Sequence, residues 1–283
     1  MFKDKKIKTI ITCIICGLIA FIVTYTGAFG RLDKRMEDIL YHHPQKVNTD
    51  IKIIKIDDAT MNQMGDFSTW NRDVYAQLVE TLCVSEEVRP AVIGFDVLFG
   101  SDRDEVSDAR FAQACAKYDN VVTGFSYIFE EEAVTDAEGN FSLDGMAVQE
   151  KVIPYAALRE VTVQGFVNAL MDEEDGTIRS AFVYFDEEDG TRALSFNAAV
   201  YEKYMEEIGE TPVYPTEENG MTFRYSGEPG DYENVSLIDV INGTVPPEAF
   251  DGSIVLVGAY APGMLDSYFV PIVSDSQMYG VEI

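Results

Sequence analysis

The sequence predicts an α/β fold: a three-layer sandwich with a largely parallel central sheet and some antiparallel edge strands, preceded by one transmembrane helix. Three β-branched or apolar runs predict strands, at residues 51–56, 91–99 and 120–128. Segments with apolar residues at helical spacing separate these runs, at 71–84 and 104–117. Because strands that alternate with helices form right-handed βαβ units, we expect a mainly parallel sheet.

A long apolar segment near the N-terminus predicts the membrane helix. The run from Ile7 to Phe29 holds no charge after Lys8, and about twenty helical residues cross a hydrocarbon core of about 30 Å. The run is longer than the usual signal-peptide core of about 7–15 residues. We therefore expect residues 10–30 to be an uncleaved anchor in the lipid bilayer, with cleavage after Ala28 as the alternative.

Basic residues on both sides of the anchor set its expected orientation. Four lysines precede it and three basic residues follow it: Lys3, Lys5, Lys6, Lys8, Arg31, Lys34 and Arg35. This bias in Lys and Arg leans toward a cytoplasmic N-terminus. The sequence has no second apolar run that would return the large domain to the cytoplasmic side. We expect a cytoplasmic tail at 1–9, an anchor in the cell membrane and the main domain outside the cytoplasm.

The rest of the chain is predicted to form a short helix followed by one domain. Residues 31–44 have apolar side chains at helical spacing and end at Pro44, which predicts a juxtamembrane helix. An extracellular α/β domain is then expected over 45–283, because no internal repeat or long linker divides this region. An acidic stretch at 130–150 interrupts the pattern and predicts an excursion, such as a hairpin, at the rim of the sheet.

The net charge restricts the partners of this domain. The chain has a formal net charge of −28, and residues 1–35 carry seven Lys or Arg against two Asp, so the remainder sums to −33. Contacts with phosphate need cations on the protein, so nucleic acid is not an expected partner. The charge is compatible with binding a small ligand or a cation, but a solubilising surface is the favoured interpretation.

Common enzyme signatures are absent from the sequence. It has no G-x-S-x-G elbow, phosphate-binding loop or H-E-x-x-H motif, and its two histidines, His42 and His43, are adjacent in the predicted juxtamembrane helix. No metal-type spacing of Cys and His occurs, and no cofactor is expected. Cys83 and Cys115 lie on predicted helices, where a disulfide stays an open question. Paired-carboxylate hydrolysis survives as an alternative.

Polar residues follow the first two predicted strands. Asp57 and Asp58 follow the first strand, and Asp96 lies near the end of the second. If these strands are parallel neighbours, their carboxyl ends share one edge of the sheet, where open α/β sheets bind ligands. The helix that joins the two strands begins beside Trp70 and Arg72, so we expect these residues to form one cluster with the carboxylates. It would be either a ligand or cation site or a structural ion-pair network.

Secondary acidic turns lie further along the chain. Asp172 and Asp175 precede Arg179 in a turn that lacks the alternating oxygen ligands of a calcium loop, so we expect Arg179 to hold the two acids. Asp266 lies in a later turn of the same acidic kind. The loop at 258–263 does not match the dinucleotide-binding pattern.

An ordered set of segments resembles the second class of CHASE domains, the extracellular sensory domains of bacterial cyclases and histidine kinases. The first are IKIIKIDDAT at 51–60, TWNRDVYAQLVETL at 69–82 and AVIGFDVLF at 91–99. The others follow in order at Val121–Gly124, Gly165–Asn168, Asp172–Arg179, Phe223–Gly227, Ser253–Gly258, Asp266–Pro271 and Gly280–Ile283. At 68–72 the first Trp and the Pro of the family's Trp-Pro-Trp-x-Arg pattern are absent.

The resemblance implies a role rather than a substrate. Such domains lie between an N-terminal transmembrane helix and further transmembrane helices that lead to a cyclase, a kinase or a related output domain. We therefore expect a chain that is truncated before its output half and is not an enzyme in this segment. We expect it to sense an unknown ligand and to be able to form a homodimer. The alternatives are a membrane-anchored surface binding or adhesion domain and a carboxylate-dependent extracytoplasmic hydrolase.

Overall fold

The computed structural model describes residues 2–25, 36, 38–39, 46–129, 148–172, 175–187, 189–214, 220–273 and 277–283. Helix α1 (Phe2–Tyr25) is long and apolar enough over Lys5–Tyr25 to cross a membrane, a criterion that an N-terminal signal sequence also meets. The end of the expected anchor, nearly all of the predicted juxtamembrane helix and most of the predicted excursion at 130–150 lie outside the described residues.

A seven-stranded sheet forms the centre of the domain, in the order β11-β1-β12-β2-β3-β4, with β5 also paired to β3. Its strands are β1 (Ile51–Ile56), β2 (Val92–Leu98), β3 (Val121–Phe129), β4 (Val148–Val152), β5 (Val163–Phe166), β11 (Glu233–Ser236) and β12 (Ile254–Ala259). Every pairing in this sheet is parallel except that of β3 with β4. The predicted largely parallel sheet with an antiparallel edge strand is confirmed.

The main core lies on one face of this sheet. Helices α3 (Asp58–Met64), α4 (Asp73–Leu82), α5 (Glu105–Tyr118), α6 (Ala156–Arg159) and α8 (Leu237–Ile241) pack there. Alternate strand residues such as Ile93 and Phe95 point into it, and the Tyr75 ring of α4 makes edge contacts with Phe95 and Phe99. Burying each such side chain contributes about 1.5–3 kcal/mol. Cys83 and Cys115 are buried in this core as free thiols.

Helix α7 (Phe196–Glu207) covers part of the opposite face. Phe196 and Val200 pack there against Val92 and Val122, so the sheet has helices on both sides. The helix approaches β5 closely, because a Cβ on Gly165 would lie 2.5 Å from the Phe196 Cα. Only glycine fits at this crossing. The predicted three-layer sandwich is therefore confirmed.

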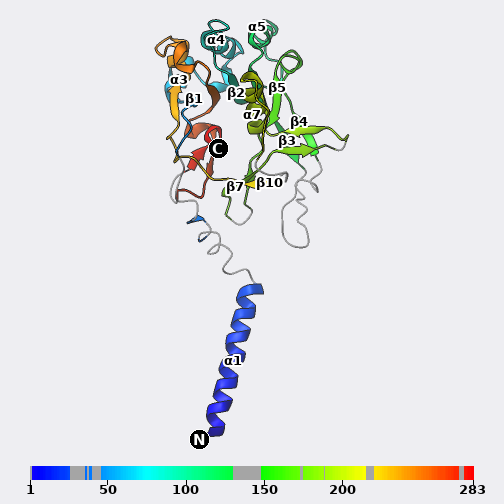
Figure 1. The fold of residues 1–283 in the computed structure, drawn as a ribbon, viewed down its shortest axis with the longest axis vertical. Coiled ribbons are helices and arrows are strands. Elements are labelled where there is room, and N and C mark those ends of the chain that lie inside the picture. The colour runs from blue at the N-terminus through cyan, green and yellow to red at the C-terminus, as the bar shows by residue number, and fades with distance from the viewer. Residues whose placement is uncertain are drawn as a thin grey trace.

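Short strands complete the face that carries α7. One small sheet consists of β6 (Leu170–Met171), β7 (Ile178–Phe182) and β10 (Gly220–Thr222). A two-stranded sheet pairs β8 (Tyr184–Asp186) with β9 (Arg192–Leu194). A second one pairs β13 (Ser267–Phe269) with β14 (Gln277–Tyr279). Turns of 3₁₀ helix lie at Phe67–Thr69 (η1), Pro247–Phe250 (η3), Pro262–Met264 (η4) and Gly280–Glu282 (η5). In Figure 1, α7 lies in front of the sheet, with β7, β10 and the C-terminus below it.

One expectation about strand order was wrong. The expected cluster assumed that β1 and β2 are neighbours, but β12 lies between them and pairs with both in parallel. β12 inserts near the middle of the sheet, where its apolar run packs on the main core with one face and is partly covered on the other. Sequence order alone does not determine this position.

Candidate functional site

A cavity of about 810 Å³ lies on the α7 face of the sheet. Ile53 of β1 and Leu256 of β12 form its floor, and Val200 and Tyr204 of α7 form one wall. The opposite walls come from β6, β7 and the segment at 280–283. Ligand pockets typically enclose about 300–1,000 Å³ and have mainly apolar linings, as this one does.

The cavity exists because α7 covers only one part of this face. The helix packs mainly on β2, β3 and β5, and β12 meets only its edge, through Ile254 and Leu256, and the short turn η5. The two faces of β12 differ accordingly. Val255 and Val257 are fully buried in the main core, whereas Ile254 and Leu256 are only half-buried and face the cavity.

Asp96 is the polar residue of β2 that faces the cavity. Phe95 and Val97 point into the main core, so Asp96 points to the opposite face of the sheet. Among the described residues no group hydrogen-bonds to its carboxyl. Burial raises the pKa of Asp96 to about 7, and the nearby carboxyl of Asp266 contributes to this rise. Asp96 is therefore a carboxyl with a raised pKa that has no hydrogen-bond donor in the described part of the chain.

Two further carboxyls, those of Asp266 and Glu282, line the cavity from the C-terminal segment. Burial raises the pKa of Asp266, against the effect of a hydrogen bond from Tyr268. Burial also raises the pKa of Glu282, although its Oε1 accepts a 2.8 Å hydrogen bond from the Gly230 N–H. Each of the three carboxyls is thus shifted toward its neutral form.

Basic side chains are absent from the described lining of the cavity, although Lys55 acts on Glu282 from outside it. Within the described part of the chain, no group of three or more His, Cys, Asp or Glu residues is arranged to hold a metal ion. The lining thus combines three carboxyl groups and several neutral polar side chains with a mainly apolar surface.

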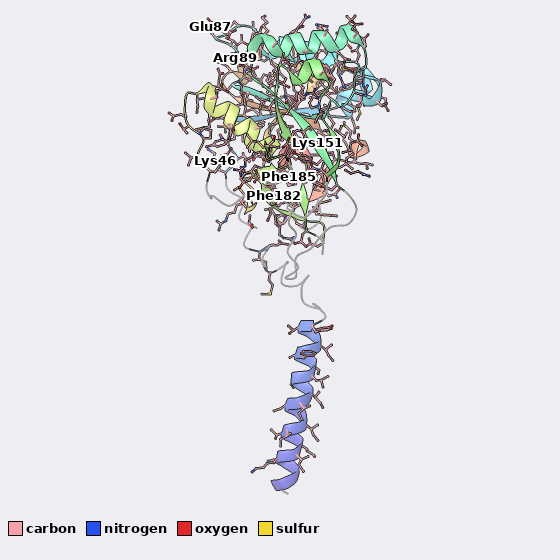
Figure 2. The ribbon with its side chains drawn as sticks, turned by 90° about the vertical axis from the view of Figure 1, so that its right-hand side faces the viewer. Lys46, Glu87, Arg89, Lys151, Phe182 and Phe185 are labelled. Carbon is pink, nitrogen blue, oxygen red and sulfur yellow. The ribbon has the colours of Figure 1, made fainter. Side chains whose placement is uncertain are left out.

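Aromatic side chains border the cavity on the β7 side. Phe166 and Phe182 line it, and both belong to a cluster with Tyr127 and Phe185. The Phe185 ring lies 4.9 Å from the Tyr127 ring, centroid to centroid. Figure 2 labels Phe182 and Phe185 in the lower part of the domain. These rings give the cavity a large, rigid apolar wall.

Arg72, expected in the same cluster as Asp96, lies on the other face of the sheet. It is 4 % exposed, its guanidinium stacks 4.8 Å from the Phe99 ring, and its Nη2 donates to the Ser101 carbonyl at 3.3 Å. Its Nε lies 3.7 Å from Oδ1 of the buried Asp108. Burial lowers the pKa of Arg72. Arg72 therefore lies in the main core beside Asp108, and it does not line the cavity.

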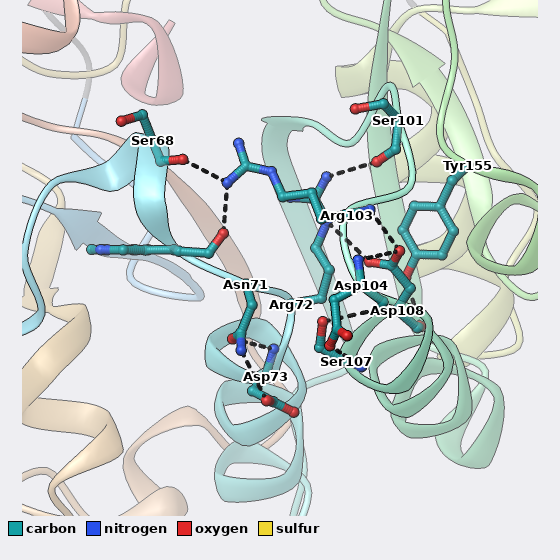
Figure 3. A network of polar contacts seen from close by, with 11 residues as sticks. Ser68, Asn71, Arg72, Asp73, Ser101, Arg103, Asp104, Ser107, Asp108 and Tyr155 are labelled. Carbon is teal, nitrogen blue, oxygen red and sulfur yellow. Dashed lines mark hydrogen bonds and ion pairs between the residues drawn. The ribbon is translucent and has the colours of Figure 1, made fainter.

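Trp70 is tied to the same network, shown in Figure 3, through Arg103. The Arg103 Nη1 donates to the carbonyls of Ser68 at 2.8 Å and Trp70 at 2.6 Å. The Arg103 backbone N–H donates to the Asp108 Oδ2 at 2.8 Å. The Trp70 indole N–H donates to the Gly65 carbonyl at 3.0 Å. These contacts hold the loop before α4 against the start of α5.

Asp57 caps helix α3. Its Oδ1 accepts hydrogen bonds from the Thr60 N–H at 3.0 Å and the Ser236 hydroxyl at 2.7 Å. Burial opposes ionisation, but the hydrogen bonds from Ser236 and Thr60 outweigh it and lower the pKa of Asp57. Asp58 is exposed in the first turn of α3. The structure thus does not bring Asp57, Arg72 and Asp96 together in one contact network.

Arg179 holds acidic residues from two parts of the chain. Its guanidinium contacts Asp175 at 2.8 Å and Asp172 at 3.5 Å, as in the expected turn. It also forms two hydrogen bonds with Asp38, at 2.8 and 2.9 Å. Arg179 is 8 % exposed, and its hydrogen bonds lower the pKa of Asp175 to about 2. Arg179 therefore connects β7 to the segment that follows the N-terminal helix.

Sequence reasoning missed several of these residues. Glu282, the aromatic lining and Asp38 were not singled out, because their roles depend on contacts between distant segments. One signal was present for Asp96, since the alternation of β2 already places it on the face opposite Phe95. Asp266 was singled out, but not as a neighbour of Asp96.

A family model described as the CHASE2 domain matches residues 14–283. The match begins within α1 and extends to the last residue, so it includes every part of the cavity. No curated protein and no solved structure matches the chain.

Proposed function

Because the chain belongs to the CHASE2 family of extracellular sensory domains, we propose that it is the signal-input domain of a membrane-anchored signalling protein. In this proposal α1 anchors the chain in the cell membrane and the α/β domain lies outside the cytoplasm. The signal molecule binds in the cavity beside the sheet, and binding controls a cytoplasmic nucleotide cyclase or kinase.

The observation that carries this proposal is the cavity with Asp96 in its lining. A protein interior is normally close-packed, and buried polar groups normally have partners. Here an apolar cavity remains open at the sheet, and it contains a carboxyl without a hydrogen bond from any described residue. Such a setting is typical of a binding site, because a ligand can supply both the missing apolar contacts and the missing donor.

The proposal is tested by filling the cavity in the natural full-length protein. Leu256→Trp and Ile254→Phe place larger side chains in the cavity, and Val106→Trp changes an exposed position on α5 as the matched control. We expect the two cavity variants to hold the cyclase or kinase output of isolated membranes at one level whatever the stimulus. The control should respond like the wild type. Folded cavity variants that respond normally would contradict the proposal.

Hydrolysis remains the second candidate, because of one specific observation. Asp96, with its pKa raised to about 7, lies beside a second carboxyl, Asp266. Pairs of carboxyls with separated pKa values act as general acid and base in many hydrolases. Turnover of glycoside or ester substrates by the purified chain, abolished by Asp96→Asn, would favour this candidate over a purely sensory role.

A further inference from the structure

We propose that the cavity binds a small organic cation: a molecule with a protonated amine on an apolar body. This inference rests on the proposed function of the cavity as the ligand site and adds the chemical class of the ligand.

The charges of the lining give the first argument. Among the described residues, its acidic side chains are the carboxyls of Asp96, Asp266 and Glu282, and no Lys, Arg or His lines it. Carboxyls brought together in an apolar setting repel one another once they ionise. A bound cation removes this repulsion, whereas an anionic ligand would add to it.

The hydrogen-bonding state of Asp96 gives the second argument. Its carboxyl faces the cavity and has no donor among the described residues. An ammonium group has three N–H donors and forms charge-assisted hydrogen bonds with carboxylates. Glu282 already accepts from the Gly230 N–H, so Asp96 is the most available partner for the amine.

The apolar and aromatic surface gives the third argument. Phe166, Phe182, Phe196 and Tyr204 line the cavity, with the aliphatic floor of β1 and β12. Aromatic faces attract organic cations and pack against apolar bodies. A metal ion does not suit this lining, because the described residues provide no cluster of three or more metal-binding side chains. An amine with an aryl or alkyl body matches both parts of the surface.

The test compares amines with alcohols of the same carbon skeleton. The probes are 2-phenylethylamine, hexylamine and tryptamine, each paired with 2-phenylethanol, 1-hexanol or indole-3-ethanol. Binding to the full chain in lipid nanodiscs is measured by isothermal titration calorimetry. Wild type is compared with Asp96→Asn, with Leu256→Trp and with Asp50→Asn, an exposed carboxyl outside the cavity that serves as the matched control.

We expect at least one amine to bind the wild type about tenfold or more tightly than its alcohol, a difference of about 1.4 kcal/mol. Asp96→Asn should remove this preference, Leu256→Trp should abolish binding, and Asp50→Asn should bind like the wild type. Thermal unfolding confirms that each variant is folded.

Two results would overturn the inference: alcohols that bind as tightly as their amines, or an amine preference that survives Asp96→Asn. Failure of every probe to bind at millimolar concentration would also overturn it. None of these results alone removes the cavity as a ligand site. That proposal fails instead if the cavity-filled variants keep a normal signalling response.

Discussion

The pKa of Asp96 is strongly raised by its position in the wall of the cavity. Burial raises this pKa from 3.8 to about 7, so the folded chain favours the neutral carboxyl. Between these two values the unfolded chain is ionised while the folded chain still holds the proton. The free energy of unfolding therefore falls as pH rises through this window, because the unfolded state binds fewer protons.

We predict that Asp96→Asn removes this pH-dependent fall in the free energy of unfolding. Urea unfolding of the detergent-solubilised chain measures the free energy of unfolding of both proteins. The two values should diverge as pH rises from about 4 to about 7, by at most about 4 kcal/mol. The variant should be the more stable protein at pH 8. Parallel pH profiles for the two proteins would show that Asp96 ionises freely in the folded state.

Arg72 should prove structural. We predict that Arg72→Met destabilises the domain by about 3–5 kcal/mol, because it leaves the buried Asp108 carboxyl without its cation. Arg192→Met is the matched control, since Arg192 forms a solvent-exposed pair with Asp186 that contributes little to stability. Denaturant unfolding measures both. An equal effect of the two substitutions would mean that the Arg72–Asp108 pair does not stabilise the core.

At the scale of elements, periodicity located the main helices and strands closely. The expected strand at 51–56 coincides with β1, and those expected at 91–99 and 120–128 differ from β2 and β3 by one residue at either end. The order of strands was not predictable in the same way. β12 has an apolar run that fits any central position, and its place between β1 and β2 depends on packing across the whole sheet.

The same limit applies to the candidate site. The face on which Asp96 lies follows from strand alternation, a local property. Its proximity to Asp266 depends on where the segment with β13 and β14 folds back, which no local pattern encodes. The Asp172–Arg179 turn was predictable because its residues are close in sequence, whereas Asp38 was not.

The pair of Arg179 with Asp38 is a candidate route from the cavity to the membrane. Ile178 and Ser180, on either side of Arg179, line the cavity. We predict that Asp38→Asn lowers stability by about 1–3 kcal/mol, because the pair with Arg179 is largely buried, but leaves the domain folded, because Arg179 keeps Asp172 and Asp175. The variant should nevertheless weaken the signalling response of the natural protein, measured in membranes beside Asp50→Asn as the control. A full response would exclude this route.

At the scale of the whole molecule, the account requires the domain to lie outside the cytoplasm. We predict that a membrane-impermeant maleimide labels Val106→Cys on intact cells, because Val106 is 76 % exposed. The wild type provides the background, since Cys83 and Cys115 are buried. Labelling that occurs only after lysis would reverse the orientation of the chain.

The central claim is that occupation of the cavity is the signal, and a tethered occupant tests it most directly. Ser180→Cys places a thiol in the lining, and benzyl methanethiosulfonate then attaches an apolar group there through a disulfide. The measurement is the cyclase or kinase output of the natural protein in membranes, with reagent-treated wild type as the control. The account predicts a change of output in the labelled variant alone, reversed by reduction. Complete labelling with unchanged output would contradict it.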